Sequence, residues 1–541
     1  MKPLHSLLLL VGLSAACHQP EPVPSATTLV PPSEETRVTV LHFSDYHSHA
    51  LPYFSEHAPN QGGIARAIGY IKSVKAAQPY TLVLNGGDMW NAGTPAWSDK
   101  YSGDCTEWKW LGEHVAAMAF GNHDVDYGWP TFAKCRDAVP FPILSANFVD
   151  SAGKPLLTAQ GKPYLVKQVG GVRIGIFALA GADFSKLVKP ANIPAGASFQ
   201  SPMEAAATTV RALRDQEKVD AVVFIGHQDR ESDFAMAKAV PGIDIILGTH
   251  SHYKGSFMRI PDTQTYFISP FQYLNYLSQV ELVFRGNKLS AVFGKLIRMS
   301  ENVLEDPALA ANVTSLQRDL EQDPTYSAKF MVIGSSAVEL DTENLDRGES
   351  VLGNFAMDIA RVSASAHAAF SSASSFRASI PPGPIRMEDY LTALPYKNKI
   401  LTFQMTGTQI QALLDLSASK QGSDNFGVTS GFRYVLSGGR ATTVQIALDK
   451  ASKEPMYEAL SPTKTYTVMT TDYLANIAAG YKDIFAQASS QADTGLIVND
   501  EIIAYIRKSS PVSAKLEGRV QTGLSPLRGV RAGGFPAAAQ Q

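Results

Sequence analysis

Residues 115–126 read Val-Ala-Ala-Met-Ala-Phe-Gly-Asn-His-Asp-Val-Asp, an apolar run followed by a glycine and a cluster of polar side chains. The apolar run 115–120 predicts a strand, and Gly121 allows a tight backbone turn where the strand ends. In open α/β sheets, ligands bind beside the carboxyl ends of the strands. Asn122 and His123 therefore stand where a binding site is expected.

The same arrangement recurs through residues 37–300, where apolar strand-like runs alternate with helical stretches, the pattern of a layered α/β domain. Several of the runs are continuous in Val, Ile and Leu, which suits strands that are covered on both faces. The predicted strands are 38–43, 81–85, 115–120, 142–147, 173–179, 221–225, 243–247, 265–268 and 278–284, and the predicted helices are 64–75 and 202–217.

Asp, His or Asn follows most of these strands, and five of the twelve histidines of the chain stand at such positions. Scattered surface histidines would not gather there. Residues i and i+2 of an extended chain point the same way, so an Asp-x-His or His-x-His pair can aim two ligands at one point. The residues concerned are Asp45, His47, Asp88, Asn122, His123, His227, His250 and His252.

Taken singly these motifs are weak, because Asp-x-His is more often a surface pair and Gly-Gly-Asp is a common turn. Their order is specific: Asp-x-His, Gly-Gly-Asp, Gly-Asn-His-Asp, Gly-His and Gly-Thr-His-Ser-His together resemble the signature of calcineurin-like metallophosphoesterases. Segments 41–47, 85–88 and 120–126 resemble, more narrowly, the 5'-nucleotidase and nucleotide-sugar hydrolase family. The resemblance covers residues 37–520.

This resemblance implies an α/β protein with two domains. The N-terminal one would be a four-layer α/β/β/α metallophosphoesterase sandwich at 37–300, and the C-terminal one an α+β substrate-binding domain at 331–523. A linker helix at 301–330 would join them. The length of 541 residues agrees with two domains, since single cores rarely grow beyond about 250–300 residues.

The resemblance also implies two divalent metal ions. One would be held by Asp45, His47, Asp88 and His252, and the other by Asp88, Asn122, His227 and His250, so that Asp88 bridges them. Two such ions, about 3.5–4 Å apart, can lower the pKa of a shared water and clamp the entering and leaving oxygens of a displacement. The imidazole-rich set favours Zn, Mn, Fe or Co over Ca, which prefers oxygen ligands.

His123 is not a metal ligand in this family. The resemblance places it over the substrate phosphate, oriented by Asp126, where it would stabilise charge or assist the leaving group. The alternative is a histidine that only hydrogen-bonds behind the metal ligands.

Segments 347–354 and 376–385 resemble the part of the second domain that binds phosphate in the family. By this resemblance Arg347 and Arg377 hold the substrate phosphate or the groups beside it, which suits the fork of donors on a guanidinium. Either arginine could instead cap a helix or pair with a nearby acid such as Glu349.

Two further segments, 425–434 and 471–474, match those that each supply an aromatic ring to stack on the nucleobase. Phe426 and Tyr473 are the matching positions, and burial in the core is the alternative for both. The sequence departs from the family at Ala479, where relatives carry an Asp that binds ribose. The resemblance therefore supports phosphate chemistry more strongly than ribose recognition.

The N-terminus has the pattern of a secretory signal at 1–16, with an apolar run and small residues before Cys17. It resembles a bacterial lipoprotein processing site, so we expect Cys17 to carry a lipid, and secretion with cleavage nearby is the alternative. Residues 17–36 are rich in Pro and predict a tether, and 524–541 predict a disordered tail. The protein would be exported to the periplasm or cell surface and touch the membrane only through its lipid.

Cys105 and Cys135 are the two remaining cysteines, and in an oxidising compartment such a pair favours a disulfide over a metal site. The 47 basic and 50 acidic residues create no large field of one sign, which argues against a nucleic-acid polymer as partner.

The leading hypothesis is metal-dependent release of phosphate from nucleoside 5'-phosphates outside the cytoplasm. The nearest alternatives are a 2',3'-cyclic nucleotide phosphodiesterase and a nucleotide-sugar pyrophosphatase on the same metal centre. Two others come from different classes: a sulfur-oxidation-type thiol-conjugate hydrolase and a non-catalytic binding lipoprotein.

Overall fold

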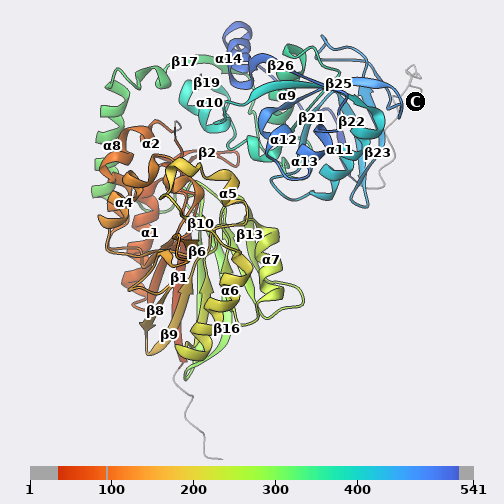
Figure 1. Ribbon diagram of the computed structural model, residues 1–541. Coiled ribbons are helices and arrows are strands. Elements are labelled where there is room, and N and C mark those ends of the chain that lie inside the picture. The colour runs from red at the N-terminus through yellow and green to blue at the C-terminus, as the bar shows by residue number, and fades with distance from the viewer. Residues whose placement is uncertain (1–34, 93–94, 523–541) are drawn as a thin grey trace, which may run out of the picture.

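The computed structural model describes residues 35–92 and 95–522, which form two domains (Figure 1). The predicted signal peptide, Cys17, nearly all of the tether and the predicted tail lie outside the described residues. Within the described ranges, no helix is long and apolar enough to cross a membrane.

The first domain contains two sheets. The strands of the first sheet are β1 (Glu35–Phe43), β4 (Thr81–Asn85), β5 (Ala117–Ala119), β6 (Ile143–Val149), β7 (Pro155–Leu157), β10 (Ser198–Phe199), β15 (Tyr276–Arg285) and β16 (Lys288–Arg298). They run in the order β10-β6-β5-β4-β1-β15-β16, with β7 beside β6. The strands of the second sheet are β8 (Tyr164–Val169), β9 (Val172–Phe177), β11 (Ala221–Phe224), β12 (Ile245–Leu247), β13 (Lys254–Arg259) and β14 (Tyr266–Pro270). Their order is β13-β14-β12-β11-β9-β8.

Aliphatic side chains of both sheets, such as Val40 and Val223, are fully buried in one shared cluster, so the sheets pack face to face. Helices α1 (Ile64–Ala77), α3 (Thr106–Leu111) and α4 (Gly128–Asp137) share a core with the outer face of the first sheet. Helices α6 (Pro202–Arg211) and α7 (Arg230–Ala239) do the same for the second. The expected four-layer α/β/β/α sandwich is confirmed.

The continuous apolar runs follow from this layering. In β1, Val38 and Val40 face the second sheet, while Leu41 and Phe43 face the helices, so neither side of the strand meets water. Strand β16 had no such signal, because it is an edge strand with many exposed positions. The predicted helix at 202–217 divides into α6 and a π-helical turn, η4 (Ala212–Gln216).

The linker contains helix α8 (Pro307–Gln322), which begins where the Asp306 carboxylate accepts a hydrogen bond from the backbone N–H of Leu309 (2.8 Å). The helix lies along the first domain beside α1 and α2 (Ala96–Tyr101) (Figure 1). Val313 and Leu320 belong to the core of that domain. The linker helix is therefore a packed part of the first domain and not a free spacer.

The second domain combines a five-stranded sheet, a four-stranded sheet and helices, as expected of an α+β domain. The first sheet has the order β21-β18-β25-β20-β26 and the second β24-β23-β22-β27, and β17 pairs with β19. The strands are β17 (Val332–Ser336), β18 (Ala368–Ser372), β19 (Gly383–Arg386), β20 (Lys399–Thr406), β21 (Gly427–Ser430), β22 (Phe432–Ser437), β23 (Arg440–Ala447), β24 (Tyr457–Ala459), β25 (Thr465–Thr471), β26 (Ser490–Ile497) and β27 (Val520–Thr522). The longer helices are α9 (Val351–Ser363), α11 (Gly407–Ser419) and α14 (Val498–Ser509).

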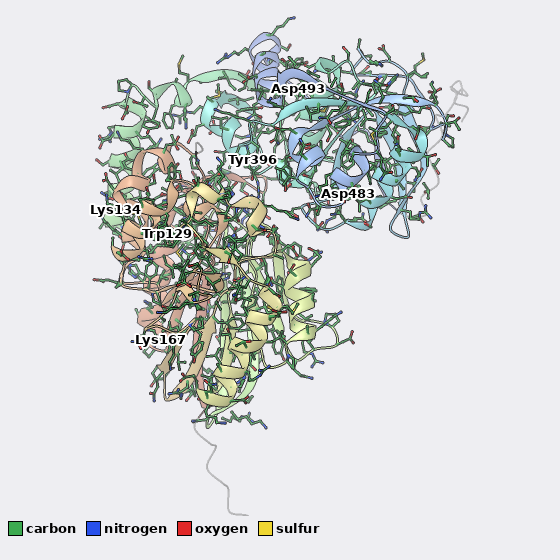
Figure 2. All side chains as sticks on the ribbon, viewed as in Figure 1. Trp129, Lys134, Lys167, Tyr396, Asp483 and Asp493 are labelled. Atoms are coloured by element: carbon green, nitrogen blue, oxygen red, sulfur yellow. A yellow bond between two sulfur atoms is a disulfide. The ribbon has the colours of Figure 1, made fainter. Side chains whose placement is uncertain are left out.

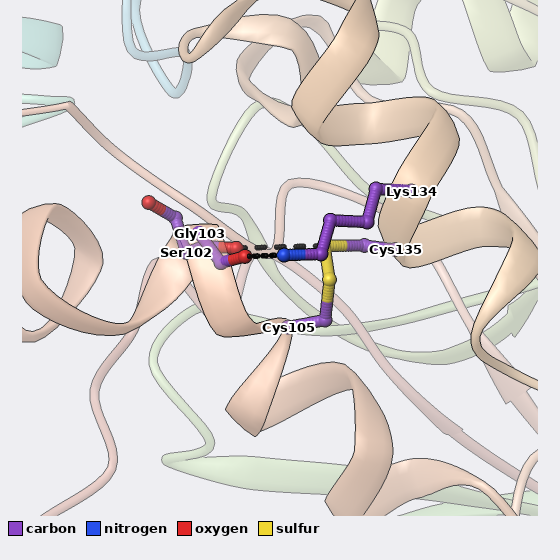
Figure 3. Close-up of a disulfide and its surroundings, with 5 residues drawn as sticks. All are labelled: Ser102, Gly103, Cys105, Lys134 and Cys135. Atoms are coloured by element: carbon purple, nitrogen blue, oxygen red, sulfur yellow. Dashed lines mark hydrogen bonds between the residues drawn. A yellow bond between two sulfur atoms is a disulfide. The ribbon is translucent and has the colours of Figure 1, made fainter.

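Cys105, directly before α3, forms a disulfide with Cys135 of α4, with 5.1 Å between their Cα atoms (Figure 3). The Lys134 ammonium also donates to the Gly103 carbonyl (2.6 Å), so the same two segments are joined twice. The predicted pairing of these cysteines is present in the structure.

Candidate metal centre

The proposed metal ligands lie at one edge of the first domain because the strands before them are parallel. Strands β1, β4 and β5 are parallel neighbours, and so are β11 and β12. At the carboxyl end of each of these strands, the chain enters a loop that carries one or two of the proposed ligands. The sequence prediction of a shared site at this edge is matched by the positions of the loops.

Two groups of side chains could each hold a metal ion. The ligand atoms of Asp45, His47 and His252 lie within 4.8 Å of one another, and those of Asp88, His227 and His250 form a second group of the same kind. Oδ2 of Asp88 lies 3.1 Å from Nε2 of His227 and 3.6 Å from Nε2 of His47. Asp88 thus stands between the two groups, where a bridging carboxylate is expected.

The donor atoms fit metal ions. Oδ1 of Asp45 and Oδ1 of Asn122 are buried and make no hydrogen bond with any described residue. Buried polar atoms are rarely left so. Two of the histidines are oriented by their other nitrogen: Nδ1 of His47 donates to the Trp90 carbonyl and Nδ1 of His227 to the Gly86 carbonyl, both at 2.7 Å. Such contacts behind metal-binding imidazoles fix the tautomer that ligates.

The charges of the site also call for cations. Burial would raise the pKa of Asp88, but the neighbouring imidazoles hold it well below its ordinary value. Burial would lower the pKa of His227, but Asp88 and then Asp45 raise it to about 9. In His252, burial and the Arg377 guanidinium lower the pKa to about 4, which keeps its imidazole neutral. A proton on His227 balances the carboxylates where a metal ion would otherwise do so.

The loops that hold the ligands have an unusual backbone. The φ angles of Asp45, His47, Asp88, His250 and His252 lie between 46° and 58°, a left-handed region that costs a non-glycine residue about 1–2 kcal/mol. Main-chain hydrogen bonds hold two of these loops together, from Asp45 N–H to the Gly87 carbonyl and from His47 N–H to the Asp88 carbonyl. Backbone strain of this kind concentrates at functional sites.

Gly121 is required by a close approach. A Cβ atom at this position would lie 2.2 Å from Oδ1 of Asp88, well inside contact distance. The same Oδ1 accepts a hydrogen bond from the backbone N–H of His123 (2.8 Å). The glycine therefore allows the third loop to fix the carboxylate that stands between the two ligand groups.

His123 lies beside the two groups without belonging to either. Its Nδ1 is 2.8 Å from Oδ2 of Asp126, and its ring meets that of His47 edge-on at 5.1 Å. Burial would lower the pKa of His123, but Asp126 and then Asp88 raise it to about 10. The imidazole is therefore cationic at neutral pH and can donate a proton from Nε2.

A cavity of about 410 Å³ opens between the domains beside this centre. Its lining from the first domain includes Asn122, His123 and His250, and its lining from the second includes Arg377 and Tyr473. Arg377 reaches across the boundary, since Nη1 lies 2.6 Å from Nδ1 of His252 and Nη2 donates to the Tyr396 hydroxyl (2.5 Å). Tyr396 lies at the junction of the two domains (Figure 2).

The structure does not bring every predicted residue to this cavity. Arg347 is largely exposed, pairs with both carboxylate oxygens of Asp346 (2.9 Å each) and lines a second cavity of about 430 Å³, which it shares with Arg377. Phe426 is fully buried in the core of the second domain, the alternative that the sequence had left open. Tyr473 alone of the two predicted aromatic residues lines the cavity beside the metal centre.

Two acidic residues at the site had not been predicted. The buried Asp124 carboxylate accepts hydrogen bonds from the backbone N–H groups of Met89 and Gly121 (both 2.8 Å), and so joins the second and third loops. Asp183 lies 3.4 Å from Nε2 of His250. Asp124 belongs to the Gly-Asn-His-Asp motif, which was a usable signal, whereas Asp183 has no motif around it.

Two family models match the chain. One describes calcineurin-like phosphoesterases and matches residues 38–254, and the other describes the 5'-nucleotidase C-terminal domain and matches residues 332–487.

Several characterised proteins are similar over most of the chain. Human 5'-nucleotidase is 25% identical, covering 91% of this chain and 92% of that protein, and the protein UshA of Escherichia coli is 25% identical, covering 94% and 98%. The trifunctional nucleotide phosphoesterase YfkN of Bacillus subtilis is 26% identical over 91% of this chain, which spans only 35% of the length of YfkN.

Solved structures give the same picture. A 5'-nucleotidase precursor of Thermus thermophilus superposes with a TM-score of 0.71 at 26% identity, covering 91% of this chain and all of that chain. The sulfate thiohydrolase SoxB of the same organism superposes with a TM-score of 0.69 at 20% identity, covering 91% and 97%, and shares the fold.

Replacing Asp88 with Ala should remove the carboxylate between the two ligand groups, so we expect loss of both metal ions and of turnover with the fold retained. Metal content by plasma emission spectroscopy and phosphate release would measure this. Asp229→Asn is a matched control, because Asp229 lines the same cavity but belongs to neither group. Full metal content in Asp88→Ala would contradict the shared site.

Replacing His123 with Ala should leave both metal ions in place and lower the rate by roughly two to four orders of magnitude, the usual effect of a positioned proton donor. Because Asp126 raises the pKa of His123 against the effect of burial, the parent should stay faster than the variant from pH 6 to pH 8. Steady-state kinetics across this range would check it. Loss of a metal ion from the variant would instead make His123 a ligand.

Proposed function

Because the chain belongs to the calcineurin-like phosphoesterases that carry a 5'-nucleotidase C-terminal domain, we propose that it hydrolyses nucleoside 5'-phosphates to nucleosides and phosphate. The observation that carries the proposal is one cavity lined by both halves of a reaction site. His250 of one ligand group, the proposed ligand Asn122 and His123 lie on one wall, and Arg377 and Tyr473 lie on the other. A phosphate can therefore meet the ligand groups while the group attached to it meets the second domain.

The proposed metal ligands are Asp45, His47, Asp88 and His252 for one ion and Asp88, Asn122, His227 and His250 for the other. We propose Zn, Mn, Fe or Co as the ions, since these accept imidazole nitrogen readily. When bound, two such ions supply a water of lowered pKa and neutralise charge on the phosphate oxygens. The protein residues then bind and orient the ester and move one proton.

Arg377 presents several N–H donors at the boundary between the metal groups and the second domain, so its proposed role is to hold phosphate oxygens. In the reaction the water oxygen forms a bond to phosphorus and the bond from phosphorus to the nucleoside oxygen breaks. His123, which Asp126 holds in position, gives its Nε2 proton to that leaving oxygen. Arg347 pairs with Asp346 outside this cavity, so we give it no direct part in the reaction.

A panel of esters would test the proposal. Phosphate release should be seen with nucleoside 5'-phosphates, and a greater rate with 2',3'-cyclic nucleotides or nucleotide sugars would reassign the substrate class. Release of sulfate from a cysteine S-thiosulfonate conjugate, without release of phosphate from any ester, would instead support the thiol-conjugate hydrolase. If the metal-bound protein hydrolysed none of these compounds, the result would support a non-catalytic binding protein.

Replacing Tyr473 with Ala should raise KM for nucleoside 5'-phosphates about ten- to a hundredfold, because a base–aromatic stack is worth about 1–3 kcal/mol. Hydrolysis of p-nitrophenyl phosphate, which has no base, should change far less. Steady-state kinetics on both esters would measure the split. An equal loss on both substrates would mean that Tyr473 serves the fold.

Phe426→Ala is the matched comparison, since this ring is fully buried among apolar side chains of the second domain. It should cost about 3–5 kcal/mol of unfolding free energy, as large core truncations do, and affect both esters alike. A selective rise of KM for nucleotides in this variant would place Phe426 at the base after all.

We also propose that the protein works outside the cytoplasm as a lipoprotein anchored through Cys17, which the signal-like N-terminal segment supports. Cys17→Ala should abolish incorporation of labelled fatty acid and release the enzyme from membranes. Equal labelling of variant and parent would refute lipidation at this residue.

A further inference from the structure

We propose that Glu107 is a positioning residue that holds the metal-binding loop of Asp45 and His47 in shape, and that the Cys105–Cys135 disulfide pins the helix that carries it. This inference rests on the metal centre of the proposed function. It does not depend on which ester is hydrolysed.

The loop after β1 cannot hold its own conformation cheaply. Asp45, His47 and Ser48 have φ angles of 52°, 46° and 56°, so three of four successive residues lie in the left-handed region. On one side, main-chain hydrogen bonds to the loop after β4 support them, including one from Ser48 N–H to the Met89 carbonyl (2.9 Å). Support on the other side has to come from a different segment of the chain.

Glu107 supplies that support with both of its carboxylate oxygens. The Tyr46 hydroxyl donates to Oε1 (2.6 Å) and the Ser48 hydroxyl donates to Oε2 (2.7 Å). Tyr46 and Ser48 are the neighbours of His47 on either side, and all three interacting side chains are buried. One side chain, 59 residues away from Ser48 in sequence, thus grips the loop on both sides of a proposed ligand.

The carboxylate occupies an unfavourable place for a purely structural group. It forms no ion pair with a described residue, and burial raises its pKa to about 7 in spite of the two hydroxyl hydrogen bonds. A buried acid without a cation is costly, and an apolar side chain of similar size would avoid that cost. The function that we infer for the carboxylate is its two hydrogen bonds to the residues on either side of His47.

Helix α3, which carries Glu107, is itself held from behind. It spans only Thr106–Leu111 and starts at Cys105, whose φ of 57° is also left-handed. The disulfide ties Cys105 to α4 (Figure 3), the helix that follows the loop of Asn122 and His123. The disulfide therefore connects the support of one metal-binding loop to the segment after another.

A second contact links helix α3 to His47. Trp108, next to Glu107, is fully buried and its ring centroid lies 5.2 Å from that of Trp90. The Trp90 carbonyl is the group that accepts from Nδ1 of His47. Helix α3 therefore acts on His47 in two ways, through the loop neighbours of the histidine and through the residue that fixes its tautomer.

The test separates metal binding from stability. In Glu107→Leu, Mn²⁺ affinity measured by calorimetry should fall about ten- to a hundredfold, the usual effect of losing a contact behind metal ligands. The melting temperature of the metal-free protein should fall slightly, because Leu leaves the buried Tyr46 and Ser48 hydroxyls without this acceptor. Glu107→Gln should recover most of the affinity, since its amide can accept from Tyr46 and donate to Ser48.

Val210→Ala is the control for instability alone. Val210 is buried on α6 in the core cluster of the other sheet, whereas Tyr46 belongs to the cluster of the first sheet, so this variant should melt earlier and bind Mn²⁺ like the parent. Unchanged Mn²⁺ affinity in Glu107→Leu would overturn the proposal. A loss of affinity in Val210→Ala equal to that in Glu107→Leu at the same melting temperature would also overturn it.

The disulfide is tested by the double variant Cys105→Ser with Cys135→Ser. Mn²⁺ affinity should fall, and adding Glu107→Leu in this background should cost clearly less than it does in the parent, because contacts that act together are not additive. Full additivity, or an unchanged affinity in the double variant, would overturn the link. If no nucleotide were hydrolysed, the proposed function would fail while these binding measurements kept their meaning.

Discussion

The arrangement of the first domain around its site depends on two buried carboxylates, those of Asp45 and Asp88. Both are at most 1% exposed, and no Lys or Arg forms an ion pair with either within the described chain. Their charge has to be balanced by imidazoles, by metal ions, or by both. The parallel strands, the left-handed loops and the close approach of Gly121 all serve to bring the balancing groups to these two oxygen donors.

The position of the site at the edge of the sheets could be predicted from the sequence, because one rule places it there. Polar residues after several parallel strands must come together, and the motif spacings at Asp45, Asp88 and His250 needed no knowledge of the fold to be noticed. The continuous apolar runs likewise predicted strands covered on both faces, which β1 and β4 confirm. The apolar pattern did not predict strand β16, because an edge strand needs few buried side chains.

Residues whose role depends on distant contacts could not be found in this way. Glu107 stands in a short helix without a motif, and its partners lie about sixty positions earlier in the chain, so nothing nearby distinguishes it from a surface glutamate. For Phe426 the sequence suggested a role in the site that the structure does not support. Resemblance placed its ring at a ligand, but packing in the second domain buries it, and neither local sequence nor periodicity separates these outcomes.

The docking of α8 onto the first domain has a consequence for how the two halves of the cavity are kept together. The helix behaves as a rigid strut of about 24 Å, given 1.5 Å per residue, and only the stretch 323–331 separates its end from β17. A connection this short allows little separation of the two domains. The binding half is thus presented to the catalytic half at a high and nearly constant effective concentration, so its specificity can diverge without any need to maintain a strong interface between the domains.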